Sequence, residues 1–257
     1  MSLFGELFEQ DENTANKVWG VTTGIVLENW SEENKGNVKV EMNLGTQGKN
    51  VSGWIPVMTP YGGKGYGMYT LPEVGSFVVI AFEMGDRNKP IVIGSLWNQK
   101  NTIPEESAVE KNTVKRFQTN GGCQVIFSEE ESKEKITIHT PAKLTVLLDD
   151  EAKTISVLDK EKKNGIIINS EKGEAALMAE TKIELKVNGT SMVTLDGNSK
   201  KVQVKSEMVD VAASQTLKLK AQSSSLEGSM VKVKADSSLG LESGAMAQLK
   251  GSMVKIN

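Results

Sequence analysis

Residues 60–98, PYGGKGYGMYTLPEVGSFVVIAFEMGDRNKPIVIGSLWN, decide the fold of this chain. A glycine-rich turn containing tyrosines opens the stretch, and a proline-containing turn then leads into the β-forming run at 77–82. Residues 85–88 predict a tight connection, because glycine, aspartate and asparagine tolerate positive φ angles. A second apolar run follows at 90–94, so the stretch predicts two neighbouring strands joined by a tight turn.

The same stretch carries a long ordered pattern, P-x-x-G-x-G-Y-x-x-Y-x-L-P-E-V-G-x-x-V-x-x-x-F-E-x-G-D-x-x-x-P-x-V-x-G-x-L-x-N. This pattern resembles the OB-fold of baseplate spike proteins, which are the phage baseplate assembly protein V group and the spike part of type VI secretion VgrG proteins. The resemblance is carried by Leu71, Pro72, Glu73, Val74, Gly75, Phe82, Glu83, Gly85, Asp86, Pro90, Gly94 and Asn98. It implies an OB-fold barrel and the role of a central spike in a contractile injection machine.

Three further segments are expected to complete the barrel. Residues 21–27 predict one strand, and residues 38–42 alternate apolar and charged side chains, which is typical of a half-buried strand. Residues 51–57 predict another strand. Together with the two strands of the opening stretch, this makes about five, the number expected in a small OB-type barrel. We assign the OB-fold domain to residues 17–98.

Two segments flank this domain. Residues 1–16 form an arm with two apolar anchors, Phe4 and Phe8. The arm is either a partly ordered terminus or an element that docks on a neighbouring subunit or hub. Residues 99–112 are polar, contain Pro104 and show neither a strand nor a helix period, so they are interpreted as a linker.

Composition argues against several classes of function. The 257 residues carry 30 Lys and Arg against 33 Asp and Glu, a formal net charge of -3, whereas a nucleic-acid binder relies on a basic surface. The single cysteine, Cys123, excludes an internal disulfide. The first residues lack the basic region and long apolar core of a secretory signal, and no apolar run reaches the roughly 18 residues of a membrane span. We therefore expect a protein made in the cytoplasm without a signal peptide.

The two halves of the chain differ in composition. All 4 Trp, 3 Tyr and 6 Phe lie at or before Phe127, and all 6 prolines lie at or before Pro141. From Thr113 onward, short alternating strands recur at Val125 and Phe127, Ile136 and Ile138, Leu144 and Val146, Ile155 and Val157, and Ile166 and Ile168. This segment extends the family resemblance through Thr119, Gly122, Val125, Phe127, Ile136, Ile138 and Thr140.

Near Val202 the spacing tightens into an internal repeat with steps of seven or eight residues. Each unit is apolar, polar, apolar, followed by a turn of small or charged residues, and a fixed period indicates a repeat architecture. The apolar positions of these units are predicted to form a trimer core that includes Val209, Val211, Leu217, Leu219, Val231, Val233, Leu239 and Leu241.

The length of the repeat decides which architecture is expected. A strand of about five residues and a turn of about three cannot complete a single-chain solenoid coil, which needs roughly twenty residues. Such a unit can form one side of a triangle, and three chains winding together would complete a prism with a narrow axis that excludes aromatic rings. We therefore predict an all-β protein in which residues 113–257 form an intertwined triangular trimeric β-helix, or β-prism.

No catalytic, cofactor-binding or metal-binding constellation is predicted. Residues 63–65 lack the order of a phosphate-binding loop, and the adjacent Asp149 and Asp150 would point to opposite faces of a strand. His139 is the single histidine. A β-helical tailspike, an adhesin or a polysaccharide-degrading enzyme is the alternative function. Sugar cleavage uses paired carboxylates and aromatic platforms, and no aromatic residue follows Phe127.

The resemblance also implies partners. A separate trimeric hub protein would hold the OB end of a homotrimer, and contact with a target membrane would be transient. Some spikes of this family bind iron through histidines near the tip, where this chain has none. A separate tip protein of the PAAR-repeat type is therefore expected to cap Val254, Ile256 and Asn257. We expect no cofactor and no nucleic acid; whether the particle is a phage, a tailocin, a secretion system or an extracellular injection particle stays open.

Overall fold

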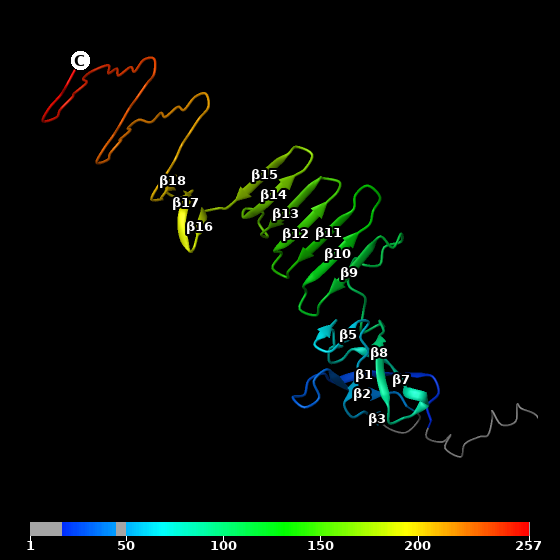
Figure 1. Ribbon diagram of the computed structural model, residues 1–257. Coiled ribbons are helices and arrows are strands. Elements are labelled where there is room, and N and C mark those ends of the chain that lie inside the picture. The colour runs from blue at the N-terminus through cyan, green and yellow to red at the C-terminus, as the bar shows by residue number, and fades with distance from the viewer. Residues whose placement is uncertain (1–16, 45–49, 257) are drawn as a thin grey trace, which may run out of the picture. The chain divides into compact units, whose positions relative to one another are not determined.

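The computed structural model describes residues 17–44 and 50–256. Its regular structure is almost entirely β-strand, which confirms the prediction of an all-β protein (Figure 1). The chain divides into two units, one ending at Val204 and one beginning at Lys205. The arm expected at residues 1–16, with Phe4 and Phe8, lies outside the described residues.

The N-terminal domain is built on one sheet. Its strands are β1 (Val21–Glu28), β2 (Asn37–Met42), β3 (Asn50–Val51), β4 (Ile55–Pro56), β7 (Phe77–Phe82) and β8 (Pro90–Ser95). They pair in the order β3-β2-β1-β7-β8, and β4 also pairs with β2. Every second residue of β2 and β7 is buried, as the alternation in the sequence predicts. The buried core consists of Val26, Val38, Val40, Met42, Ile55, Val78, Ile80, Phe82 and Val92.

The ends of this sheet meet at one point. Val57, which directly follows β4, forms a parallel bridge with Val92 of β8. The Met58 amide donates a hydrogen bond to the Val92 carbonyl at 2.8 Å. The barrel is therefore joined by a single bridge rather than by a continuous ladder, as in a partly open OB barrel.

The prediction of one continuous strand at residues 51–57 is wrong. The structure divides this segment into β3 and β4, because the Ser52 hydroxyl accepts the Val40 amide hydrogen at 2.9 Å. A side chain thus takes the place of a backbone carbonyl in the ladder, and regular pairing stops until Ile55.

The connection between β7 and β8 is the tight turn that the sequence predicts, and it begins two residues earlier. A short 3₁₀ turn, η3 (Glu83–Gly85), contains Met84 at φ 50° and Gly85 at φ 80°. The Asp86 carboxylate then accepts the Asn88 amide hydrogen at 2.9 Å. The glycine-rich turn that opens the deciding stretch forms a small hairpin of β5 (Gly62–Gly63) and β6 (Tyr66–Gly67).

The second sheet is a seven-stranded antiparallel meander in chain order (Figure 1). Its strands are β9 (Val114–Gln118), β10 (Gln124–Ser128), β11 (Lys135–His139), β12 (Thr145–Asp149), β13 (Thr154–Leu158), β14 (Gly165–Asn169) and β15 (Glu174–Met178). A smaller sheet follows, made of β16 (Lys182–Val187), β17 (Thr190–Asp196) and β18 (Lys201–Val204). Each hairpin within these two sheets has a residue of positive φ in its turn: Gly122, Ser132, Lys143, Lys153, Lys162, Gly173, Asn188, Gly189 and Lys200.

These hairpins differ from the expected arrangement, in which each level of the prism takes one strand from each of three chains. Between Val114 and Val204, consecutive strands pair within one chain, except that β15 and β16 lie in separate sheets. The physical reason is the left-handed residue in each turn, because it lets the chain reverse over a few residues.

The unit that begins at Lys205 has a different backbone. Among its described residues, up to Ile256, no residue belongs to a strand and every residue is exposed. Bends recur at 207, 214, 222, 229, 236, 244 and 252, which are the steps of seven or eight residues seen in the sequence. No described residue after Lys200 has a positive φ, so these bends do not fold the chain back into hairpins.

In the part of the chain that the structure describes, no helix has the length and apolar character needed to cross a membrane.

Glu184 links the strands of the smaller sheet on their charged face. Its carboxylate accepts hydrogen bonds from Lys186 at 2.9 Å, from Lys182 at 3.2 Å and from the Ser191 hydroxyl at 3.2 Å. The hydrogen bond from Lys186 is the largest cause, followed by that from Lys182, and together these contacts lower the pKa of Glu184 from 4.5 to about 2. Ser191 lies on β17, so the charged form of Glu184 stabilises the β16–β17 hairpin.

The close packing of the N-terminal domain gives a first prediction. A Cβ atom on Gly24 would lie 2.5 Å from Val40 Cγ1 and 2.7 Å from the Glu41 carbonyl oxygen, whereas a Cβ on Gly94 would meet nothing within 4 Å. We expect Gly24→Ala to lower the free energy of unfolding of this domain by about 1–3 kcal/mol through overpacking. Gly94→Ala is the matched control and should leave it nearly unchanged. All 4 tryptophans lie at or before Trp97, so tryptophan fluorescence during denaturant unfolding measures this domain. Equal stability of the two variants would contradict the packing argument.

The Glu184 contacts predict a pH effect. A lowered pKa contributes stability above the ordinary value of 4.5, and this contribution is lost as the pH falls from 4.5 to about 2. Amide hydrogen exchange of the 182–196 peptide, corrected for its intrinsic rate, should lose protection across this range, and Glu184→Gln should reduce that pH dependence. Glu171→Gln, which removes a carboxylate without an ion pair among the described residues, should behave as the wild type. An identical pH profile for Glu184→Gln and wild type would refute the role of Glu184.

Candidate assembly surface

One face of the seven-stranded sheet is apolar from β9 to β15, apart from Lys115 on the edge strand. Residues directly opposite each other in antiparallel strands lie on the same face, and the register places Phe117, Val125 and Ile138 in one row. A second row contains Phe127 and Ile136. The apolar face comprises Phe117, Val125, Phe127, Ile136, Ile138, Val146, Leu148, Ile155, Val157, Ile166, Ile168, Ala175 and Leu177.

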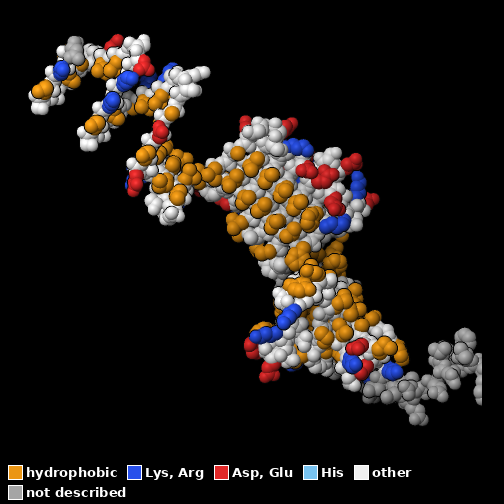
Figure 2. All heavy atoms as spheres, viewed as in Figure 1, with side chains coloured by type: hydrophobic (Ala, Val, Ile, Leu, Met, Phe, Trp, Pro, Cys, Tyr) orange, Lys and Arg blue, Asp and Glu red, His pale blue; other side chains and the backbone are white. Residues whose placement is uncertain are grey.

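This apolar face has no cover in the single chain. Hydrophobic side chains lie in rows over β9 to β15 in Figure 2. Val125 and Val146 are half-buried, and the other large apolar side chains of this face are exposed by 37% at Ile136 to 55% at Phe117. A contiguous exposed apolar patch marks an interaction site in a soluble protein, whereas single exposed apolar residues do not. The apolar face is therefore the strongest candidate for a functional surface in the first unit.

The opposite face of the same sheet, the charged face, carries ion pairs, and its middle row also includes Ile126, Leu147 and Ile167. Lys135 and Asp149 lie directly opposite each other and form an ion pair of 3.0 Å, and Lys135 also contacts Glu151 at 3.3 Å. The hydrogen bond from the Ala152 amide, and then that from Lys135, hold the pKa of Asp149 below its usual value. The Asp149 and Glu151 carboxylates in turn raise the pKa of Lys135. The Lys135–Asp149 pair joins two strands on the charged face, so the apolar face is the side of the sheet on which a partner would pack.

The three-stranded sheet also has one charged face and one apolar face. Glu184, Lys182 and Lys186 lie on its charged face. Its other face is built from the paired residues Ile183, Leu185, Val193, Leu195, Val202 and Val204. Within this set, Leu185 is 54% exposed and Val202 is 70% exposed. An uncovered apolar surface thus continues up to the end of the first unit.

The predicted trimer core residues lie in the unit after Lys205. Their exposed fractions run from 50% at Val231 to 85% at Leu219 and Leu241, and none belongs to the buried core cluster of the chain. The full set is Val209, Val211, Leu217, Leu219, Val231, Val233, Leu239 and Leu241. A single chain leaves all of them open to solvent and joins them by no strand pairing among the described residues.

The residues predicted to bind a tip protein are also exposed where the structure describes them. Val254 is 46% exposed and Ile256 is 85% exposed. Asn257 lies outside the described residues.

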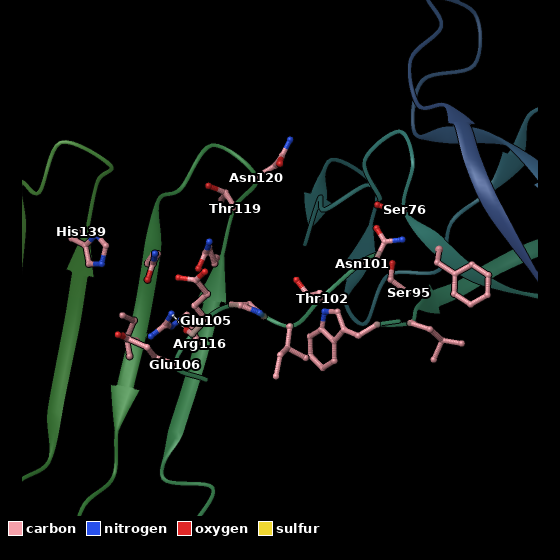
Figure 3. A pocket seen from close by; sticks show the side chains of 18 of the residues that line it. Ser76, Ser95, Asn101, Thr102, Glu105, Glu106, Arg116, Thr119, Asn120 and His139 are labelled. Atoms are coloured by element: carbon pink, nitrogen blue, oxygen red, sulfur yellow. Dashed lines mark hydrogen bonds between the residues drawn. The ribbon is translucent and has the colours of Figure 1, made fainter. Parts of the chain in front are cut away.

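A polar hollow of about 810 Å³ lies within the first unit, beside the segment that connects β8 to β9 (Figure 3). The Arg116 guanidinium donates a hydrogen bond to the Glu105 carbonyl, and a His139 ring nitrogen lies 3.1 Å from the Thr140 carbonyl. None of the hydrogen bonds between described residues of this hollow joins a nucleophile to a base. The structure also places no group of three or more His, Cys, Asp or Glu in a metal-binding arrangement among the residues it describes. Other residues lining the hollow are Ser76, Ser95, Asn101, Thr102, Glu106 and Asn120.

Part of the apolar surface was not predicted from the sequence. No strands were predicted at residues 174–196, although Ile183 and Leu185 alternate with charged neighbours there and this alternation is a strand signal. Strand β9, which contributes Phe117 to the apolar face, was also not predicted.

Comparisons with known proteins agree with this architecture. Residues 22–97 match the type VI secretion system/phage-baseplate injector OB domain. The chain is 32% identical over 128 residues to the type VI secretion system spike protein VgrG5 of Pseudomonas aeruginosa, covering 46% of this chain and 16% of that protein. It is 28% identical over 149 residues to the spike protein VgrG1a of the same organism, covering 52% of this chain and 23% of that protein.

A third relative carries an additional activity in its name. The actin cross-linking toxin VgrG1 of Vibrio cholerae is 28% identical over 102 residues, covering 38% of this chain and 9% of that protein. The chain thus spans less than a quarter of the length of each of these curated relatives. The resemblance expected from the sequence is confirmed: residues 22–97 match the OB domain of type VI secretion and phage-baseplate injectors, and about half of the chain is similar to VgrG-type spike proteins.

Proposed function

We propose that this chain is the structural central spike of a contractile injection machine and acts as a membrane-piercing homotrimer. The observation that carries the proposal is the uncovered apolar face of β9 to β15, which follows an injector-type OB domain in the same chain. Three copies that turn this face toward a common axis would remove it from water and leave the charged face outside. The hydrophobic effect, at about 25 cal/mol per Å² of buried apolar surface, favours that arrangement.

The unit after Lys205 supports the same stoichiometry. Its described backbone forms no strand ladder with itself, and backbone N–H and C=O groups need hydrogen-bond partners when they are buried. Chains of the same sequence can supply these partners as neighbouring strands. Three chains suit a repeat of seven or eight residues, because each repeat forms one side of a triangle and no chain closes a coil alone.

We propose two protein partners for this trimer, both implied by the family resemblance. A trimeric hub protein would hold the OB end, and a PAAR-type tip protein would contact Val254, Ile256 and Asn257. The role is structural and not enzymatic. Relatives named as spike proteins support this role, and the named toxin contains much sequence beyond the segment it shares with this chain.

The oligomeric state provides the first test. We expect analytical ultracentrifugation to give three times the mass of one chain. Val231→Asp should remove the resistance of the trimer to heated detergent, because it places three carboxylates at one level in the middle of an apolar axis. Lys232→Asp is the matched control: the adjacent residue of an extended segment points the opposite way, so the trimer should persist. A folded monomeric wild type would defeat the proposal.

The tip contact provides a second test. The double variant Val254→Asp, Ile256→Asp should abolish co-purification with a separately expressed PAAR-type protein, while the many remaining apolar levels keep the trimer intact. Lys255→Asp, which lies between the two positions, should retain the partner. Retention of the PAAR-type protein by the double variant would contradict the assigned contact and leave the trimer proposal unaffected.

A further inference from the structure

Five charged residues of the second unit occupy equivalent positions and alternate in sign. Each lies two residues before one of the bends at 222, 229, 236, 244 and 252. In chain order they are Lys220, Glu227, Lys234, Glu242 and Lys250. The same position holds Lys205 and Ala212 before the bends at 207 and 214, so the unbroken alternation runs from Lys220 to Lys250. Alternating charges at one position of a repeat indicate a contact between repeats.

The single chain does not supply that contact. Among the described residues no ion pair joins any two of these five side chains. Lys234 instead lies 3.4 Å from Asp236, with the two side chains 75% and 94% exposed. Glu227 accepts a hydrogen bond from the Ser225 hydroxyl at 2.8 Å.

A longer repeat establishes how many segments make one turn. Met208-Val209 recurs as Met230-Val231, 22 residues later, and as Met253-Val254, 23 residues after that. Three bend intervals separate each recurrence. The sequence therefore has a longer period of three segments, which is the number expected for one circuit of a triangle.

This count, together with the trimer, determines which segments lie side by side. The inference therefore rests on the proposed function. In a threefold-symmetric winding, each segment of one copy lies beside the next segment of a neighbouring copy, about 4.8 Å away. All segments on one side run in the same direction, so equivalent positions lie next to each other. Lys220 then lies beside Glu227 of a neighbouring copy, and Glu227 lies beside the next copy's Lys234.

We propose that the five residues form an alternating charge ladder between the three copies and that this ladder fixes their register. The apolar positions specify the register only weakly, because every segment from Leu217 onward, except that of Ser224 and Leu226, presents two apolar side chains to the axis. If one copy slips by one segment, the apolar contacts persist while Lys220 meets Lys234 and Glu227 meets Glu242. Like charges in direct apposition disfavour the wrong register, as charge patterns do in other specific interfaces.

The chain contains a matched position outside the ladder. Lys232 lies on the same outward side as Lys234, two residues away. Its equivalents in the adjacent segments are Ser225 and Gly240, which carry no charge. A charge reversal at Lys232 therefore changes the net charge by the same amount as one at Lys234 without placing like charges together.

The experiment compares five forms of the full chain: wild type, Lys234→Glu, Lys232→Glu, Asp236→Asn, and the fully reversed ladder K220E/E227K/K234E/E242K/K250E. Mass is measured by ultracentrifugation, and trimer survival by heating in detergent followed by electrophoresis. Lys234→Glu should lower the temperature of trimer loss by about 5 °C or more, since it creates like-charge contacts in all three copies. The reversed ladder restores alternation and should return to the wild-type temperature. Lys232→Glu and Asp236→Asn should behave as wild type.

Salt provides an independent readout. The difference between Lys234→Glu and wild type, measured as thermal dissociation without detergent, should shrink at about 1 M salt, where the screening length falls to about 3 Å. A trimeric wild type with an unaffected Lys234→Glu variant would overturn the ladder alone, and so would equal damage from Lys232→Glu or a reversed ladder that fails to recover. A monomeric wild type would overturn the proposed function, and the ladder with it.

Discussion

Backbone hydrogen bonding is the constraint on which the architecture after the OB domain depends. Up to Val204, the strands satisfy it by pairing with their neighbours in the same chain. Beyond Lys205, the described backbone extends through regular bends and finds no such neighbour. The first unit thus satisfies its backbone hydrogen bonds within the chain, whereas the second unit, in our proposal, satisfies them between chains.

Many strands carry apolar side chains on one face only, and burial of that face is a second requirement besides backbone hydrogen bonding. In the N-terminal domain, the apolar side chains of β2 and β7 meet each other and form a closed core. In the sheets that follow, similar alternation produces an apolar face with nothing packed on it. The same sequence period therefore leads to a self-contained domain in one case and to an assembly surface in the other. The difference lies in whether the strands curve back onto themselves.

Much of this fold could be predicted from the sequence, because the alternating period identifies strands directly. Residues 38–42 and 77–82 are examples in which the predicted strand and its buried face agree with the structure. The split between β3 and β4 could not be predicted, since it depends on a hydroxyl that reaches across to another strand. The sequence also did not reveal which strands pair with each other. Lys143, Lys153 and Lys162 adopt positive φ without being glycine or asparagine, so the hairpins that they close have no clear signature. The candidate surface was found in its apolar positions, while its extension through β9 and β15 required the register.

Lys200 is the last residue with a positive φ in the part of the chain that the structure describes, and folding before and after it differs in kinetics. Hairpins before it join residues close together in sequence, and local contacts of this kind form quickly and independently of protein concentration. Winding after it requires, in the proposed trimer, that other chains are present, because no segment gains a partner within its own chain. The sheets of the first unit would bring the three chains together before the second unit winds. Synthesis at low copy number should therefore delay the trimer, while the hairpins up to Lys200 form at an unchanged rate.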